Sequence, residues 1–307
     1  MDEFELIERY FAGHDRGPGV VVGIGDDGAV LQPDPGRELV TVVDAVVAGV
    51  HFPVDINAAD LGYRAVAVNL SDIAAMGARP RWMTLSLTLP GADPDWLQAF
   101  ASGLHAAASE HDVALVGGDT TSGSEIVVSV QITGDVEAGK AILRSGAAVG
   151  DTIYVTGFLG DGAAGLSLFK DGKTDPGLCE AFLRPRARVE FGRSLLGVAS
   201  AAIDVSDGLI DDLGKLLAAS GVGGRVDLDA LPLSGAMREH FGREAALGFA
   251  LAGGDDYELC FTAGGALPAA GDLPVTPIGT VTAGDELVLF DQSGPVAFED
   301  GGYRHFR

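Results

Sequence analysis

The sequence predicts a two-domain protein of mixed α/β (α+β) class, and three observations lead to this fold class. Strand-like segments with alternating apolar residues are separated by segments with helical periodicity. A glycine-rich turn near residues 146 to 151 interrupts this pattern, and the pattern begins again after it. The chain has 307 residues, of which 47% are hydrophobic and 21% charged, which is enough for two domains of ordinary size. We therefore expect one domain over residues 1–146 and a second over 147–307.

The first domain is expected to combine helices with strands of a mixed sheet. Residues 2 to 12 are predicted to be a helix because Phe4, Ile7 and Phe11 fall on one helical face. The predicted strands are ELVTVVDAVV (38–47), RWMTLSLTLP (81–90) and EIVVSVQITGDV (125–136), and apolar residues alternate with others in the last two. Two further helices are predicted between these strands, at residues 58–76 and 93–110.

The second domain repeats the alternation of strands and helices. Its predicted strands are TIYVTG (152–157), AAIDV (201–205) and YELCFTA (257–263). Its predicted helices include DGAAGLSLF (161–169) and LIDDLGKLL (209–217).

The overall charge excludes several classes of partner. A net charge of −24 makes a nucleic acid or an anionic membrane surface an improbable ligand, since phosphate contacts need clustered Lys and Arg. The N-terminal residues are acidic where a secretory signal would be basic, and no apolar run is long enough to span a membrane, so we expect a cytoplasmic protein. The two cysteines, Cys179 and Cys260, lack metal-ligand spacing and are expected to be small packing residues.

Aspartates recur at the ends of apolar segments, where acids are unusual. They are Asp26 and Asp27 in GIGDDG, Asp44 in VTVVDAVV, Asp72 in AVNLSDIAAMG, Asp119 in LVGGD, and Asp204 and Asp207 in AIDVSDGL. Asp72 has no cation three or four residues away on its helix, so no local ion pair can satisfy it. Each acid alone could cap a helix or close a turn, but their recurrence favours a shared site.

Such a set of acids indicates divalent metal ions and phosphate. If two carboxylates approach to about 5 Å, they repel by roughly 3 kcal/mol, so the set needs cations. All-oxygen ligation without nearby His or Cys suits Mg²⁺ or Mn²⁺, and Mg²⁺ is commonly shared between a few carboxylates, waters and substrate phosphates. Glycines adjoin these acids, Arg144 is a candidate phosphate clamp, and Ser206 and Asp207 are placed to cap a helix or bind phosphate at its start.

Other nucleotide motifs are weak or absent. GDGAAG at 160–165 fits the dinucleotide pattern G-x-G-x-x-G, but no strand ending in an acid follows about 20 residues later. The sequence has no phosphate-binding loop of the form G-x-x-x-x-G-K-[ST] and no protein-kinase motif set. Any use of ATP must therefore depend on another architecture.

Seven stretches together resemble one known family. They are GIGDDGAVL, VDAVVAGVHF, AVNLSDIAAMGARP, LVGGDTTSG, RSGAAVGDTIYVTG, IDVSDGL and GGDDYELCFT. In this order, over nearly the whole chain, they resemble the thiamine-monophosphate kinase family of the aminoimidazole-ribonucleotide-synthetase-like superfamily. The resemblance implies a homodimer whose N-terminal sheets form a barrel, and Mg²⁺-dependent transfer of the ATP γ-phosphoryl group to thiamine monophosphate.

The resemblance also implies roles for individual residues. The implied ligands of several Mg²⁺ ions are Asp27, Asp44, Asp72, Asp119, Asp204, Asp207 and the backbone of Val43. Gly118, Asp119, Arg144 and Ser206 are implied to lie near ATP, with Asp72, Asp119, Arg144 and Asp207 acting in the transfer. His51, Asp255 and the aromatic Tyr303 are the implied contacts of the thiamine phosphate.

The chain departs from the family pattern in two places. Val42 and Val43 stand where hydroxyl residues are common, so that only backbone carbonyls could bind metal there. Asp255 replaces the usual Glu and is one methylene shorter. Two alternatives stay open: another ATP-using enzyme of the superfamily, and a non-enzymatic protein that binds divalent cations.

Overall fold

The computed structural model describes residues 3–298, and this part of the chain divides into two compact units. The first unit runs to Ile73 and continues from Ala78–Gly139, and the second takes Ala74–Gly77 and the chain from Lys140 onward. The division at 139/140 lies a few residues before the predicted boundary near 147. No described helix is long and apolar enough to cross a membrane.

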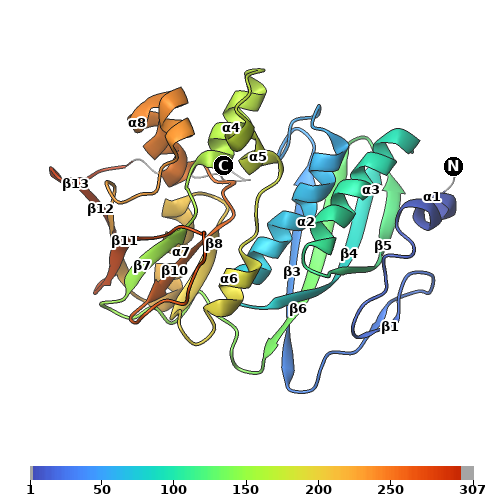
Figure 1. Ribbon diagram of the computed structural model, residues 1–307, viewed down its shortest axis with the longest axis horizontal. Helices are drawn as coiled ribbons and strands as arrows, with labels where there is room; N and C mark the ends of the chain where they lie inside the picture. The colour runs from blue at the N-terminus through green and yellow to red at the C-terminus, as the bar shows by residue number, and fades with distance from the viewer. Residues whose placement is uncertain (1–2, 299–307) are drawn as a thin grey trace. The chain divides into compact units, whose positions relative to one another are not determined.

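The first unit contains a four-stranded mixed sheet with two long helices on one face (Figure 1). The strand order is β3 (Arg37–Val47), β6 (Val127–Glu137), β4 (Arg79–Leu89) and β5 (Ala114–Ser122). Only the β4–β5 pair is parallel. The helices are α2 (Ala58–Ala75) and α3 (Pro94–Ser109), while α1 (Glu3–Tyr10) and the short ribbon of β1 (Val20–Val22) and β2 (Val30–Leu31) complete the unit.

The core of this unit follows the alternation predicted from the sequence. Met83, Leu85 and Leu87 of β4 are buried, whereas the Ser86 between them is exposed. The helices present Leu97, Phe100 and other fully buried residues to the same core. The predicted strands and helices are confirmed, with ends that differ by a few residues at most.

A buried ion-pair cluster fixes one end of the sheet. The side chain of Asp135 is 0% exposed and accepts hydrogen bonds from Arg37, Arg79 and Arg81. Burial alone would raise the pKa of Asp135, but the hydrogen bonds from Arg37 and Arg79 hold it below its ordinary value. Asp34 pairs with Arg79 and Arg81 from the surface, with 62% of its side chain exposed. The cluster thus joins three strands through one carboxylate.

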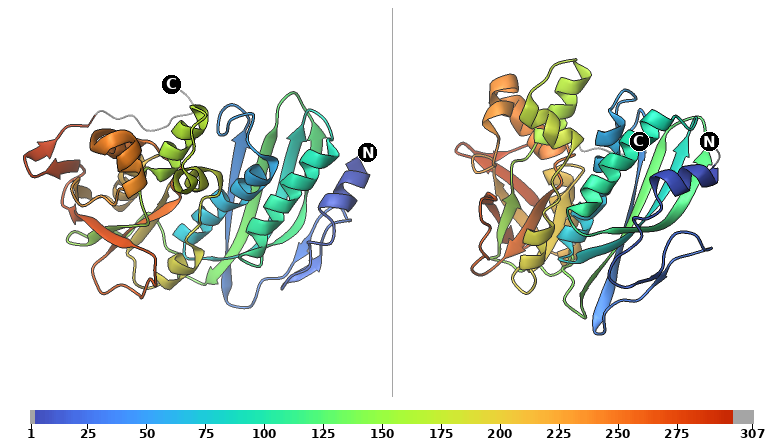
Figure 2. Two further views of the ribbon diagram at one scale, coloured as in Figure 1. Left: turned by 45° about the horizontal axis from the view of Figure 1, so that its top comes forward. Right: turned by 45° about the vertical axis from the view of Figure 1, so that its right-hand side comes forward.

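The second unit is built on a seven-stranded sheet (Figure 2). Its strand order is β13 (Gly294–Val296), β12 (Leu287–Asp291), β9 (Gly223–Asp227), β11 (Val275–Thr282), β7 (Thr152–Thr156), β10 (Glu258–Ala263) and β8 (Ala201–Val205). All pairs are antiparallel except β12–β9. Because β7 is antiparallel to both neighbours, the GDGAAG segment after it is not part of a parallel dinucleotide-binding unit.

Five helices complete this unit. They are α4 (Asp161–Lys170), α5 (Pro176–Leu183), α6 (Val189–Ser194), α7 (Leu209–Ser220) and α8 (Gly235–Ala252). Helix α7 packs on β8 and β9, whereas α4, α5 and α8 pack on one another. The loops at the starts of α4 and α7, together with the segment before β10, hold the polar residues considered below.

Candidate active site

The first unit contains a cavity of about 480 Å³ between the loop before β2 and the strand β5. The loop contributes residues 23–29, β5 contributes residues 115–120, and Ile7, Phe11 and Leu85 complete the lining. The cavity lies in the volume range of small-molecule sites, and its lining combines apolar side chains, glycines and acids.

Three of the predicted acids line this cavity. Asp26, Asp27 and Asp119 are all exposed at its wall. The Asp26 carboxylate accepts a hydrogen bond from the backbone N–H of Asp27 at 2.8 Å, and Asp15 accepts one from Ile24 at 3.1 Å, so the loop is held by its own side chains. The sequence interpretation that GIGDD and VGGD belong to one place is consistent with this cavity.

A close approach of two backbones requires glycine at position 118 of β5. Gly118 pairs with Leu85 of β4 and has a φ of 155°. A Cβ at this position would lie 1.9 Å from the Leu85 carbonyl oxygen. Only glycine fits here, and its presence leaves the backbone beside Asp119 open to the cavity.

The acids of the first unit fit Mg²⁺ that is shared with phosphate rather than held by protein alone. Within residues 3–298 no three His, Cys, Asp or Glu side chains are close enough to hold a metal ion by themselves. The carboxylates at the cavity are exposed oxygen donors, which matches the preference of Mg²⁺ for few carboxylates, waters and phosphate oxygens. By their chemistry these oxygen donors suit Mg²⁺, and its binding here stays a prediction.

Asp44, Asp72 and His51 are outside the lining of this cavity. Asp44 is exposed on β3, and its backbone N–H donates to the side chain of the buried Asn69 of α2 at 3.0 Å. Asp72 follows Asn69 by three residues and is half-buried on the same helix. His51 accepts a hydrogen bond from the backbone N–H of Val47 on Nδ1 at 3.0 Å, so the neutral ring carries its proton on Nε2.

In the second unit, the loop after β8 is held by an acid from the following helix. The carboxylate of Asp212 accepts the backbone N–H groups of both Ser206 and Asp207 at 2.9 Å. Lys215 donates to Asp207 at 2.6 Å and to Asp212 at 2.8 Å. Burial raises the pKa of Asp212, and Lys215 opposes that shift.

Of the two interpretations of Ser206 and Asp207, capping of α7 is wrong: the N-cap residue is Gly208, and no side chain caps the helix. The backbone N–H groups of Ser206 and Asp207 donate to Asp212. Asp204 is buried at 5% exposure in β8. These residues stay candidates for metal or phosphate contacts because the loop presents Ser206 and Asp207 at intermediate exposure.

The remaining predicted residues have different settings. Asp255 is half-buried, and its backbone N–H donates to the Ser206 carbonyl at 2.9 Å, so these two predicted residues lie together. Arg144 is exposed. Val43 has 63% of its side chain exposed on β3. Tyr303 lies outside the described residues.

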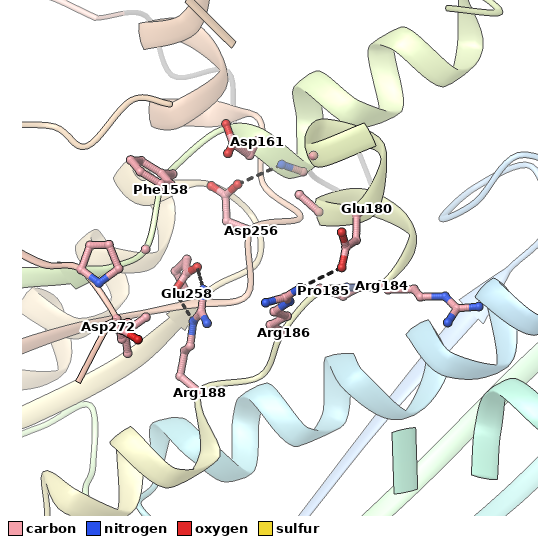
Figure 3. A pocket seen from close by; sticks show the side chains of 16 residues that line it. Phe158, Asp161, Glu180, Arg184, Pro185, Arg186, Arg188, Asp256, Glu258 and Asp272 are labelled. Carbon is pink, nitrogen blue, oxygen red and sulfur yellow. Dashed lines mark hydrogen bonds and ion pairs between the residues drawn. The ribbon is translucent and has the colours of Figure 1, made fainter. Parts of the chain in front are cut away.

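Sequence reasoning missed a second polar cavity, of about 470 Å³, in the second unit (Figure 3). Its wall contains the ion pair of Arg188 with Glu258, and Glu258 also accepts from the hydroxyl of Thr156. Asp256 binds the backbone at the start of α4, and burial raises its pKa well above the ordinary value. Asp161, whose pKa burial also raises, lies on the same wall. Asp256 could have been found from the sequence, because GGDDYEL contains two adjacent aspartates after glycines, as GIGDD does.

Comparison with known proteins identifies the family. Residues 25–136 match the N-terminal domain of AIR synthase related proteins, and residues 148–292 match the C-terminal domain of the same family. The thiamine-monophosphate kinase of Salmonella typhimurium is 49% identical over 99% of this chain and 98% of its own. That of Bacillus subtilis is 35% identical over the full length of both chains.

Solved structures agree with the sequence relatives. A thiamine-monophosphate kinase from Stenotrophomonas maltophilia K279a has a TM-score of 0.85 at 45% identity, covering 94% of this chain and 96% of its own. A structure described as AaThiL complexed with AMPPCP and TMP has a TM-score of 0.80 at 33% identity, with 92% of each chain covered. The hydrogenase maturation protein HypE, at 20% identity and a TM-score of 0.79, shares the fold. With its cavities, its acids and these relatives considered together, the chain belongs to the AIR synthase related family, and within it to the thiamine-monophosphate kinases.

Proposed function

We propose that this protein transfers the γ-phosphoryl group of ATP to thiamine monophosphate, yielding thiamine diphosphate and ADP. One observation carries the proposal: a relative of the same fold, matched over 92% of each chain, is described as complexed with AMPPCP, an analogue of ATP, and with TMP. The full-length identity of 49% to a thiamine-monophosphate kinase supports the same reaction.

The cavity of the first unit is the proposed place of the nucleotide. Its apolar wall, with Phe11, Leu85 and Leu115, can take a base, and the backbone beside Gly118 and Asp119 can face phosphate oxygens. Arg144 is the proposed clamp on the donor phosphates, since a guanidinium binds phosphate oxygens in pairs.

Metal ions are part of the proposal. Mg²⁺, when bound, neutralises and aligns the phosphates of donor and acceptor. The residues proposed to hold it are Asp27, Asp44, the Val43 carbonyl, Asp72 and Asp119 in the first unit, and Asp204 and Asp207 in the second. Because the exposed acids repel one another without cations, binding of the ions also offsets this repulsion.

The acceptor needs no general base. The phosphate of thiamine monophosphate is already ionised at neutral pH, so its oxygen can attack without losing a proton to the protein. The protein must instead align two polyanions, which is a task for positioning and electrostatic stabilisation. On the acceptor side, we propose that Asp255, His51 and Tyr303 contact the organic part of the molecule, whose cationic ring favours an acid and an aromatic face.

A homodimer is the proposed assembly. Helices cover one face of the sheet of the first unit (Figure 1). On the other face, β3 exposes four alternate residues to solvent: Leu39, Thr41, Val43 and Ala45. Exposed apolar residues in a row along a strand are typical of an interaction surface. We propose that a second copy covers this face, and that the protein works in the cytoplasm, where ATP and Mg²⁺ are available.

The reaction is tested by incubating the purified chain with ATP, MgCl₂ and thiamine monophosphate and separating the thiamine compounds by chromatography. Thiamine diphosphate should accumulate, and unphosphorylated thiamine should not replace the acceptor. Consumption of ATP without thiamine diphosphate would instead favour another enzyme of the superfamily. Binding of Mg²⁺ with no loss of ATP would favour a non-enzymatic protein.

A further inference from the structure

The segment from Gly254 to Tyr257 has an unusual backbone conformation. Gly254, Asp255 and Tyr257 have φ values of 69°, 62° and 53°. Within residues 3–298, Asp112 is the single other non-glycine residue with positive φ. This region is unfavourable for residues with a side chain, so the conformation persists only where its surroundings fix it.

Hydrogen bonds to the end of β8 and the residue after it fix this segment. The backbone N–H groups of Asp255 and Tyr257 donate to the carbonyls of Ser206 and Val205 at 2.9 and 2.8 Å. The segment is therefore tied to the loop that holds Asp207. Its conformation and that of the loop depend on each other.

Asp256 anchors the segment to the start of α4. Its two carboxylate oxygens each lie 2.8 Å from the backbone nitrogen of Gly160. One of them also lies 3.3 Å from the backbone nitrogen of Gly162 (Figure 3). Gly160 has no side chain to cap the helix, so Asp256 supplies the cap from another part of the chain. A Cβ on Gly162 would lie 2.1 Å from the Asp255 carbonyl oxygen, which shows how closely the two backbones approach.

Tyr257 then fixes the side chain of Asp255. The Tyr257 hydroxyl donates to Oδ1 of Asp255 at 3.1 Å, and Tyr257 is only 9% exposed. A buried ring has little freedom, and a hydrogen bond to a charged acceptor is stronger than one between neutral groups. The positive φ of both residues brings a carboxylate and a phenol two positions apart within reach of each other.

We propose that Tyr257 is a positioning residue for the acceptor, acting through Asp255. The phenol holds the Asp255 carboxylate in the direction in which it meets the cationic ring of thiamine monophosphate. This role rests on the proposed function. It also compensates for the shorter side chain of Asp255, because a short carboxylate that is held in place loses less freedom on binding than a mobile one.

The test compares Tyr257→Phe with the wild type in steady-state kinetics with each substrate varied in turn. We expect the KM for thiamine monophosphate to rise about 3- to 10-fold, with kcat and the KM for ATP unchanged within about 2-fold. Tyr154→Phe is the matched control, because it removes a hydroxyl from a half-buried tyrosine of the same unit, on β7. Its kinetics should equal those of the wild type.

A double variant separates positioning from an independent contact. In the Asp255→Ala background, Tyr257→Phe should have no further effect on the KM for thiamine monophosphate, because the carboxylate that the Tyr257 hydroxyl positions is already absent. An equal rise in both backgrounds, or no rise in the single variant, would overturn the positioning role. A wild-type protein that forms no thiamine diphosphate would overturn the proposed function itself, and this role with it.

Discussion

Gly118 offers the most direct link between the packing of the sheet and the proposed nucleotide cavity. In Gly118→Ala the new methyl group would lie 1.9 Å from the Leu85 oxygen and 2.8 Å from the Leu85 carbonyl carbon. These are backbone atoms of the paired strand, so no side-chain rotation can relieve the contact. The strands β4 and β5 must separate locally by more than about 1 Å to restore a normal van der Waals distance.

The cost of this separation can be approximated from its parts. Overpacking a close-packed interior costs about 1–3 kcal/mol, and holding alanine at a φ of 155° adds about 1–2 kcal/mol. We expect Gly118→Ala to lower the free energy of unfolding by about 2–5 kcal/mol and to weaken ATP binding at the wall it distorts.

The neighbouring glycine provides the control. A Cβ on Gly117 would meet no atom within 4 Å, so Gly117→Ala should change the free energy of unfolding by less than about 1 kcal/mol. Urea unfolding of both variants, followed by circular dichroism, measures the difference. Equal stability of the two variants would refute the argument that the approach of Leu85 to Gly118 requires glycine.

Three other predictions concern separate parts of the chain. Asp135→Asn should cost about 3 kcal/mol or more in urea unfolding because it leaves arginines without their buried partner, whereas Asp34→Asn should cost under about 1 kcal/mol; equal effects would contradict the role of burial. The pKa of Asp135 is lower in the folded protein than its ordinary value of 3.8. The contribution of Asp135 to the free energy of unfolding should therefore be full above pH 3.8 and be lost as the pH falls through the lowered pKa. Arg144→Ala should raise the KM for ATP about 10-fold or more and leave the KM for thiamine monophosphate within about 2-fold. An unchanged KM for ATP would show that Arg144 is an ordinary surface residue with no part in binding ATP. Burial raises the pKa of the Cys260 thiol, so a thiol reagent should label the half-buried Cys179 in the native protein and reach Cys260 only after unfolding, as mass spectrometry would show.

The elements were predictable from the sequence because their signals are local. Alternation in β4 and helical periodicity in α2 and α3 gave these segments within a few residues of their observed ends. The order of strands in either sheet was not predictable, because pairing depends on contacts between distant segments. The cluster around Asp135 is an example, since its carboxylate meets Arg37 98 residues away in the chain.

Some residues that line the cavity of the first unit could be predicted where acids adjoin glycines, as for Asp26 with Asp27 and Gly118 with Asp119. That this cavity is the nucleotide site stays a prediction. Contacts in which one side chain acts on a distant backbone could not be predicted in this way. The capping role considered for Ser206 is not observed, because α7 begins after Gly208 and no side chain caps it. The hydrogen bonds from the loop amides to Asp212 were also not predictable, because the spacing of the residues does not show which acid accepts them.

One labelling experiment tests whether the protein transfers the γ-phosphoryl group of ATP to thiamine monophosphate. The protein is mixed with ATP labelled at the γ-phosphate, MgCl₂ and thiamine monophosphate, and the labelled products and ADP are quantified over time. We expect the label in thiamine diphosphate in a one-to-one ratio with ADP, with little free phosphate. Label released as orthophosphate while thiamine monophosphate stays unchanged would contradict this transfer.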